Sequence, residues 1–216
     1  MKKYQSYVKG KWIDSHILKF LYSLLISYKE KLFKIIFFEI YYSIINFGKG
    51  KSFKPPHIHP CPYYFIRKIS QFINKKKISS IVDLGCGFGR LTNFLNNTTN
   101  AKIYGYEIDK EVFETASKNK KKNVTIKLGD ILNIDYNNLH VECFILNDPF
   151  YQSTKKNLTA HENLIKKIEQ SRANLGHKYY LITINVNEAR NYIFKKQKLI
   201  KVVSAGSMRK IKFYSS

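Results

Sequence analysis

The fold of this chain follows from one stretch, Ile81-Val82-Asp83-Leu84-Gly85-Cys86-Gly87-Phe88-Gly89-Arg90-Leu91. A short hydrophobic run carries Asp83 near its end, and glycines follow at every second position. This pattern predicts a strand, a tight loop and the start of a helix, where a ligand can approach the backbone closely. The spacing differs from the G-x-G-x-x-G of dinucleotide sites, because the third glycine comes one residue early. An acidic residue just before the first glycine also favours a cationic ligand over a pyrophosphate.

Strand-like and helix-like segments alternate along the chain from residue 63 onward. Short β-branched runs predict strands, and longer segments with apolar residues at helical spacing predict helices. This alternation is typical of an α/β fold with a Rossmann-like, doubly wound and mostly parallel sheet, here of seven strands. Strands are expected at 79–84, 102–107, 124–128, 141–146, 179–186, 199–204 and 209–214, and helices at 63–74, 90–95, 110–120, 155–175 and 188–195.

The first third of the chain differs from the rest in composition. Residues 51–62 are rich in proline and lysine and predict a linker between a basic helical extension, 1–50, and the main domain, 63–216. Within the extension, 16–47 carries aromatic and aliphatic side chains interrupted by lysines. These helices either cover a flank of the main domain or lie on an anionic membrane surface. A transmembrane anchor is the third alternative, although no uncharged apolar run reaches about 18–20 residues.

The chain is strongly basic, with 38 lysines and arginines against 15 acids and a formal net charge of +23. Most of the excess is lysine rather than arginine, as an AT-rich coding sequence would also produce. The positive field favours an anionic membrane face, nucleic acid or an acidic substrate, and charge alone does not choose among them.

The cysteines and the first residues bear on the compartment. Three cysteines at wide spacing predict no disulfide framework and a reducing environment. Residues 1–15 lack the apolar core of a cleavable signal. We therefore expect a cytoplasmic protein, with peripheral attachment to the inner membrane face as the alternative.

Histidine and cysteine side chains offer little for a metal site. The His-x-His-x-Cys pattern at 57–61 has no fourth ligand nearby in sequence, and its prolines fit a plain loop, so no metal is expected. Three further histidines, His140, His161 and His177, show no pairing pattern and are expected at the surface.

Three further segments each place an acidic or amide side chain at the end of an expected strand or just after it. They read Tyr104-Gly105-Tyr106-Glu107-Ile108-Asp109, Leu128-Gly129-Asp130-Ile131 and Phe144-Ile145-Leu146-Asn147-Asp148-Pro149-Phe150. Together with Asp83-x-Gly85-x-Gly87-x-Gly89, their order and spacing resemble the motifs of the class I S-adenosylmethionine-dependent methyltransferases. One glycine motif alone is a weak signal, whereas four segments in the right order are a strong one.

The resemblance implies S-adenosylmethionine as the cofactor, lying across the carboxyl ends of the first, second and fourth strands. The glycine loop would line its methionine part, Asp83 would face its ammonium group, and Glu107 would bind both ribose hydroxyls. Asp130 and the Ile131 amide would face the adenine, although Asp130 could also be a helix N-cap. The implied cofactor-binding residues are Tyr63, Asp83, Gly85, Cys86, Gly87, Gly89, Glu107, Ile108, Asp130, Ile131 and Asn147, and the implied catalytic residues are Asp148, Pro149 and Phe150.

The segment Asn147-Asp148-Pro149-Phe150 leaves the acceptor open. Amino-methylating nucleic-acid enzymes carry Asp/Asn-Pro-Pro-aromatic here; a side chain and a backbone carbonyl hold the target amino group, and the ring stacks on a flipped base. This chain lacks one of those prolines. It looks closer to the Asn-Pro-Phe version of a group of small bacterial methyltransferases, which also carry a basic helical N-terminal region and a Pro-x-Pro-Tyr segment, here Pro60-Cys61-Pro62-Tyr63. Asp148 in place of asparagine departs from that version.

The sequence therefore predicts an S-adenosylmethionine-dependent methyltransferase in which Asp148 acts as hydrogen-bond acceptor or base for the nucleophile and Tyr63 closes the site. The acceptor is an oxygen or a nitrogen on a glycan, a lipid-linked molecule, a protein or a nucleic acid. The alternative is a non-catalytic protein on the same scaffold that binds nucleic acid or membrane through its basic arm. Intact acids at positions 83, 107 and 130 argue against that alternative. The oligomeric state stays open.

Overall fold

The computed structural model describes residues 61–150, 154–186, 192–205 and 209–216. The expected helical extension, 1–50, lies outside these residues, as does nearly all of the expected linker and its two histidines. The membrane-binding interpretation of the extension therefore stays a prediction.

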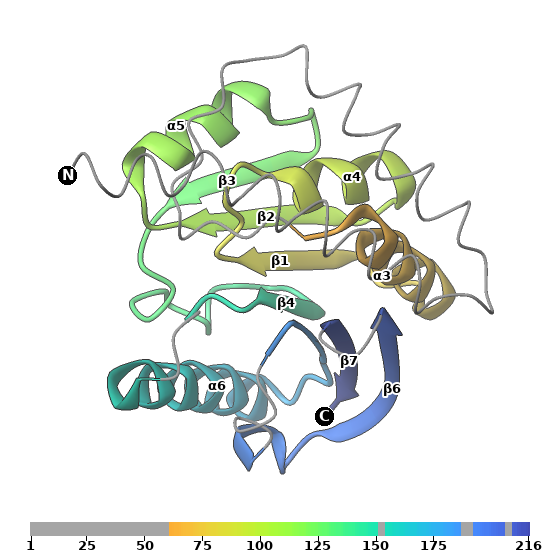
Figure 1. Ribbon diagram of the computed structural model, residues 1–216. Coiled ribbons are helices and arrows are strands. Elements are labelled where there is room, and N and C mark those ends of the chain that lie inside the picture. Colours follow the sequence, from red (N-terminus) through yellow and green to blue (C-terminus); the bar gives the residue numbers. More distant parts are fainter. Residues whose placement is uncertain (1–60, 151–153, 187–191, 206–208) are drawn as a thin grey trace, which may run out of the picture.

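One sheet of seven strands forms the centre of the described structure (Figure 1). Its strands are β1 (Ser80–Leu84), β2 (Lys102–Glu107), β3 (Val124–Leu128), β4 (Cys143–Asn147), β5 (Tyr180–Ile184), β6 (Lys198–Ala205) and β7 (Arg209–Ser215). In space they follow the order β3-β2-β1-β4-β5-β7-β6. The strands β1 to β5 are parallel, and β7 pairs antiparallel with both β5 and β6. The predicted mostly parallel, seven-stranded Rossmann-like sheet is confirmed.

The sheet reverses its strand order between β1 and β4. The chain adds β2 and β3 on one side of β1 and then adds β4 and β5 on the other. In open α/β sheets, ligands bind outside the carboxyl ends of the strands at such a switch point. Leu84 and Leu146 pair in register there, so that the next residues, Gly85 and Asn147, lie side by side at the carboxyl edge.

Four helices cover the sheet: α3 (Tyr63–Lys76), α4 (Arg90–Thr98), α5 (Lys110–Asn119) and α6 (Lys155–Leu175). The first three lie on one face, and α6 lies on the other (Figure 1). Because side chains alternate along a strand, Ile81 packs with the first group, whereas Val82 and Leu84 pack towards α6. In the part of the chain that the structure describes, no helix combines the length and the apolar content that a bilayer span requires.

Local signals set the helix ends at both edges of the sheet. The Asp109 carboxylate caps α5 by accepting from the Val112 N–H at 3.1 Å, and the Thr154 hydroxyl caps α6 by accepting from Asn157. Gly176 ends α6 at a φ of +64°, where glycine has no steric cost. These caps fix the positions of the short loops that connect the helices to the strands.

Several expected elements differ from the structure in extent. The strand expected at 141–146 begins two residues later, because the Val141 N–H is bonded to Leu139 in the preceding turn. The strand expected at 179–186 is shorter at both ends. Of the helix expected at 188–195, the described part is one 3-10 turn at 192–194, and the rest lies outside the described residues.

The prediction that His161 lies at the surface is wrong. Its side chain is 0% exposed on α6, with its ring 5.7 Å from that of Phe150 and 5.5 Å from that of Phe194. His161 precedes Leu164 and Ile168 by three and seven residues, so it belongs to the helical stripe that faces the sheet. The other two histidines in the described residues are exposed, as expected.

Arg172 fixes the loop between β3 and β4. Its side chain is 2% exposed, and it donates to the carbonyls of Leu139 at 3.0 Å, Val141 at 3.3 Å and Tyr136. The guanidinium lies 5.5 Å from the centre of the Phe144 ring. Burial lowers the pKa of this guanidinium. A single buried cation thus ties three carbonyls of one loop to the end of α6.

Gly105 in β2 is expected to tolerate no side chain. A Cβ atom built on it would lie 2.9 Å from the Cys86 Sγ and 3.0 Å from the Cys86 Cβ. Gly105→Ala should lower the free energy of unfolding by about 1–3 kcal/mol, as overpacking does, and urea denaturation measures this. Gly129→Ala is the matched control, because its nearest neighbour atom is 3.7 Å away. Cys86→Ala should recover part of the loss, and strictly additive effects of the two changes would contradict the contact.

Candidate functional site

The glycine loop adopts the conformation that its sequence predicts. Gly85, Gly87 and Gly89 have φ angles of +87°, +54° and +78°, a region that residues with a Cβ rarely adopt. The N–H groups of Gly85 and Cys86 both donate to the Tyr106 carbonyl, at 3.0 and 2.9 Å. The loop is therefore anchored to β2 and presents backbone without side chains between β1 and α4.

The Glu107 carboxylate links the end of β2 to this loop. It is 8% exposed and accepts from the N–H of Gly87 at 2.9 Å, of Ile108 at 2.9 Å and of Asp109 at 3.0 Å. A carboxylate offers about four acceptor positions. About one position is then left for a ligand hydroxyl, so a second ribose hydroxyl would have to displace a backbone donor.

The Asp83 carboxylate is buried beneath the loop. It is 2% exposed, and its Oδ1 atom has no hydrogen-bond partner among the described residues. Burial, and then the charge of Glu107, raise the pKa of Asp83 to about 7. Two carboxylates with a vacant acceptor atom favour a cation at this edge of the sheet.

The segment after β3 is held by a turn. The Asp130 carboxylate accepts from the Leu132 N–H at 2.8 Å and from the Asn133 side chain at 3.3 Å. A turn follows Asp130 rather than a helix, so the interpretation of this residue as a helix N-cap is wrong. The Ile131 carbonyl accepts from the Tyr136 hydroxyl at 2.7 Å. An open hollow of about 390 Å³ lies between Asp130 and the ends of β2 and β3.

The segment after β4 meets the glycine loop. Asn147 ends the strand half-buried, and Asp148 has a φ of +43°, a conformation of asparagine, aspartate and glycine that is frequent at functional sites. A Cβ built on Gly85 would lie 3.4 Å from the Pro149 Cβ. The Phe150 side chain is half-buried against the core beside α6. The predicted catalytic segment and the glycine loop are therefore neighbours.

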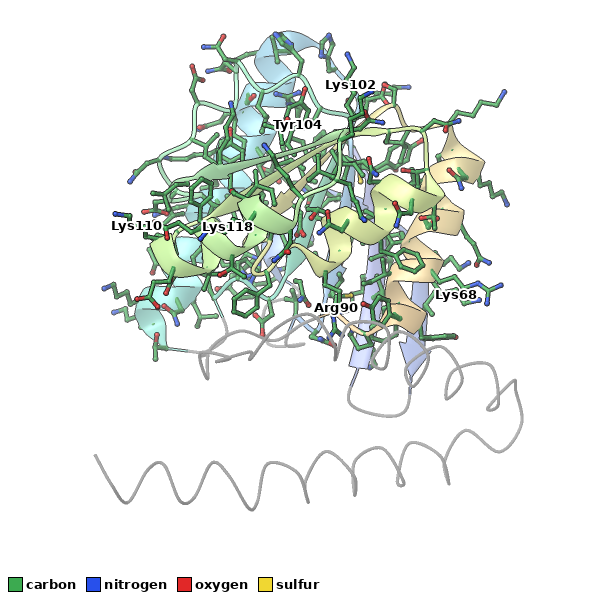
Figure 2. All side chains as sticks on the ribbon, turned by 90° about the horizontal axis from the view of Figure 1, so that it is seen from above. Lys68, Arg90, Lys102, Tyr104, Lys110 and Lys118 are labelled. Carbon is green, nitrogen blue, oxygen red and sulfur yellow. The ribbon has the colours of Figure 1, made fainter. Side chains whose placement is uncertain are left out.

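Tyr63 lies beside the start of α4. Its ring is 6% exposed, the Arg90 guanidinium lies 4.8 Å from its centre, and the Phe94 ring lies 5.8 Å away. Figure 2 shows Arg90 next to the first turn of α3. Tyr63 thus packs against the residue that follows the glycine loop, and its role towards a cofactor stays a prediction.

Ile108 and Cys86 differ in exposure. The Ile108 side chain is 67% exposed directly after Glu107, where an apolar surface could contact a flat ring. Cys86 is buried, and burial raises the pKa of its thiol further above the ordinary value. A thiol that stays protonated is a poor nucleophile, so Cys86 is a small residue packed in the loop and not a nucleophile.

Sequence reasoning missed three residues that shape this edge. The backbone carbonyl of Tyr106 anchors the loop, the Thr92 hydroxyl donates to the Gly89 carbonyl at 2.9 Å, and Tyr136 supports Ile131. Only Thr92 had a local signal, as a hydroxyl three residues beyond the last glycine. Among the described residues, no group of His, Cys, Asp and Glu side chains could hold a metal ion.

The chain matches the family described as "Methyltransferase domain" over residues 75–205. The ribosomal RNA small subunit methyltransferase A of Mesomycoplasma hyopneumoniae (strain 232) is 34% identical over 93 residues, which cover 41% of this chain and 36% of that protein. The chain thus spans about a third of this relative.

Solved methyltransferase structures share the fold. An RNA methyltransferase from Salinibacter ruber in complex with S-adenosyl-L-homocysteine superposes with a TM-score of 0.54 at 16% identity, covering 73% of this chain and 93% of that one. The magnesium protoporphyrin IX methyltransferase of Synechocystis PCC 6803, with bound S-adenosylmethionine, gives 0.57 at 12% identity, with coverages of 83% and 92%.

Replacement of Glu107 is expected to weaken S-adenosylmethionine binding. Glu107→Ala removes the anchor of the Gly87 N–H and would remove the charge-assisted bond to the ribose that the resemblance implies, so calorimetric titration should show a loss of about 1.5–3 kcal/mol. The variant should also discriminate less against a 2′-deoxy cofactor analogue. Glu111→Ala, an exposed acid in the first turn of α5, is the control. Wild-type protein that ignores the 2′-hydroxyl would contradict this role.

The residues at the carboxyl edge fit S-adenosylmethionine. The cofactor carries a sulfonium and an ammonium group, and the edge offers the unsatisfied, buried Asp83 oxygen, a second carboxylate on Glu107 and a glycine backbone that allows close approach. With the family match over more than half of the chain, this chain belongs to the methyltransferase domain family.

Proposed function

We propose that this enzyme methylates an amino nitrogen on a base of RNA. The observation that carries the proposal is the position of Asn147-Asp148-Pro149-Phe150, which follows β4 beside the glycine loop. It supplies an amide, a carboxylate and an aromatic ring within four residues. An exocyclic amino group needs acceptors for its hydrogens and a surface for the ring that carries it, and this set offers both.

The roles follow from the chemistry of methyl transfer. The cofactor supplies an electrophilic methyl group, so the protein has to align a nitrogen lone pair with it in line. The Asn147 amide oxygen accepts one N–H and turns the lone pair out of conjugation with the base. The Phe150 ring, half-buried at the end of the segment, stacks on the base. Asp148 takes the proton that the methylated nitrogen loses.

Two further observations support an RNA acceptor. The relative with 34% identity is described as a ribosomal RNA methyltransferase, and its matched region covers 41% of this chain. The net charge of +23 suits a polyanionic substrate. The solved structures are too distant in sequence to bear on the acceptor, because they share the fold alone.

The proposal is tested by transfer of a labelled methyl group from S-adenosylmethionine. The acceptors are an unmethylated small-subunit ribosomal RNA transcript and, in parallel, protein, glycan and lipid fractions. We expect label in the RNA and, after digestion, an N-methylated nucleoside by mass spectrometry. A 2′-O-methylated nucleoside, or label confined to another fraction, would contradict the proposal.

A variant of the stacking residue separates acceptor binding from cofactor binding. Phe150→Ala should raise the KM for RNA about 5- to 150-fold, which corresponds to about 1–3 kcal/mol for one stacked base. Phe150→Tyr should retain activity. The affinity for S-adenosylhomocysteine, measured by calorimetry, should change little in both variants. A Phe150→Ala enzyme with an unaltered KM would show that this ring does not hold the base.

A further inference from the structure

The edge of the sheet opposite the cofactor site carries a row of lysines. This edge is formed by the amino-terminal ends of β1 to β5 and the start of β6. The segments that lead into these ends contain eleven lysines and one acid, Glu142. We call these lysines the amino-edge row: Lys75, Lys76, Lys77, Lys102, Lys120, Lys121, Lys122, Lys178, Lys195, Lys196 and Lys198.

The two edges of the sheet differ in charge. At the carboxyl edge, the loops hold the acids of the cofactor site, among them Asp83, Glu107, Asp130 and Asp148. At the amino edge, the Glu142 carboxylate already accepts from the Ser79 N–H at 2.7 Å and from its hydroxyl at 2.9 Å. The oxygens of this carboxylate are thus already hydrogen-bonded to Ser79. The positive charges of the lysines outnumber its single negative charge and dominate the electrostatic field at this edge.

The lysines of the row are exposed, and two of them contact other side chains: Lys196 pairs with Glu169 at 3.8 Å, and the Lys76 ammonium lies 6.0 Å from the centre of the Tyr180 ring. For Lys102 and Lys121, the hydrogen bonds in the structure involve backbone atoms, to Ser79, Asn93 and Val124. Lys102, the first residue of β2, and Lys110, which begins α5 after that strand, lie towards opposite edges of the sheet (Figure 2). The ammonium groups of the row can therefore meet a partner without any rearrangement of the fold.

The dimensions of the row fit a phosphate backbone. Six strand spacings separate β3 from β6, which is about 29 Å at roughly 4.8 Å each. At a rise of about 3.4 Å per nucleotide, that length matches about eight phosphates of one strand. Lysine contacts of this kind position a nucleic acid without reading its bases.

A membrane fits this edge less well. The exposed side chains that flank the amino ends of β1 to β5 are polar or charged, and those that are apolar, such as Ile78, Val141 and Tyr179, are buried. Exposed apolar side chains lie at one end of the row, at Leu199 and Ile200 in β6. Stable attachment to a lipid surface needs apolar side chains that insert beside the lysines. A flexible polyanion needs the charges alone.

We propose that the amino-edge row binds the phosphate backbone of the RNA acceptor at a distance from the methylated base. The inference rests on the proposed function for its choice of polyanion. Strands of five or six residues place the row about 17–20 Å from the cofactor site. A single nucleotide cannot reach both edges, so the acceptor is an RNA large enough to extend along the domain from one edge to the other.

The first test measures binding of the RNA transcript by the full-length protein. The variant Lys102→Gln/Lys121→Gln/Lys178→Gln removes three charges from the row, and Lys110→Gln/Lys166→Gln/Lys201→Gln removes three exposed lysines elsewhere. In the row variant, the slope of log K against log salt should fall by about 2–3, and affinity at 0.1 M salt should fall at least about tenfold. Equal losses in both variants would mean that net charge alone acts, and would overturn the proposal.

The second test compares substrates of different length in the methylation assay. The row variant should raise the KM for the long transcript and leave the KM for a short oligonucleotide around the modified base unchanged. An equal effect on both substrates would place the row at the active site and overturn the inference. If wild-type protein methylates no RNA, the proposed function fails, whereas the binding test still decides on the row.

A third measurement addresses the membrane. Sedimentation with phosphatidylserine vesicles should depend little on the three substitutions in the row. Loss of vesicle binding in the row variant, together with unchanged RNA binding, would assign the row to a lipid surface instead and overturn the proposal.

Discussion

Gly87→Arg should abolish S-adenosylmethionine binding while the protein keeps its fold. Gly87 has a φ of +54°, and its N–H donates to the Glu107 carboxylate. A side chain there would occupy the space where a ligand approaches the loop, and a guanidinium would add a positive charge next to a cationic cofactor. Calorimetric titration should show an affinity at least about 100-fold lower, a change of about 2.8 kcal/mol or more.

The chain offers a matched control for this substitution. Gly176 ends α6 at a φ of +64°, and no atom lies within 4 Å of a Cβ built there. Gly176→Arg therefore carries the same charge and a similar backbone cost of about 1–2 kcal/mol, far along the chain from the loop. It should bind cofactor normally. Unchanged affinity in the Gly87 variant, with normal circular dichroism, would remove the glycine loop from the site.

Features with local causes could be predicted from the sequence. The switch from period two to helical spacing located β1, β2, β3 and α6 closely, and three alternating glycines predicted the positive φ angles that the loop shows. The doubly wound, mostly parallel sheet followed from the alternation of strands and helices. The approach of Pro149 to Gly85 then follows from the register of Leu84 with Leu146.

Features that depend on contacts far apart in the chain could not be predicted. Arg172 looks like an ordinary helical arginine, and its three carbonyl partners lie more than thirty residues away. The burial of His161 was not predicted, because its polar ring was considered without its position in the stripe of α6 that faces the sheet. The hydrogen bonds that occupy the acceptor positions of Glu107 could not be predicted either, because one of the donors, Gly87, is twenty residues away in the sequence.

Asp83→Asn should lower the affinity for S-adenosylmethionine and make it independent of pH. The pKa of Asp83 is raised to about 7 by burial and by the Glu107 charge, so the carboxyl is largely protonated at pH 6 before the cofactor binds. A cationic ligand favours the ionised form. Wild-type affinity should therefore rise between pH 6 and 8 with release of a proton, which calorimetry in buffers of different ionisation enthalpy measures. The asparagine variant should bind about 10- to 150-fold more weakly at pH 8, the loss of one charge-assisted bond.

The same carboxyl should affect the stability of the protein without cofactor. Because its pKa is raised in the folded state from an ordinary value of 3.8, the protonated group stabilises the fold fully below about pH 4, and this contribution is lost as pH rises through 7. The melting temperature of wild type should fall over this interval relative to that of Asp83→Asn. Asp135→Asn, an exposed acid on the same edge, should follow wild type. Parallel melting curves for wild type and Asp83→Asn would show that Asp83 is ionised in the free protein, and that its vacant oxygen is already matched to a positive charge before the cofactor arrives.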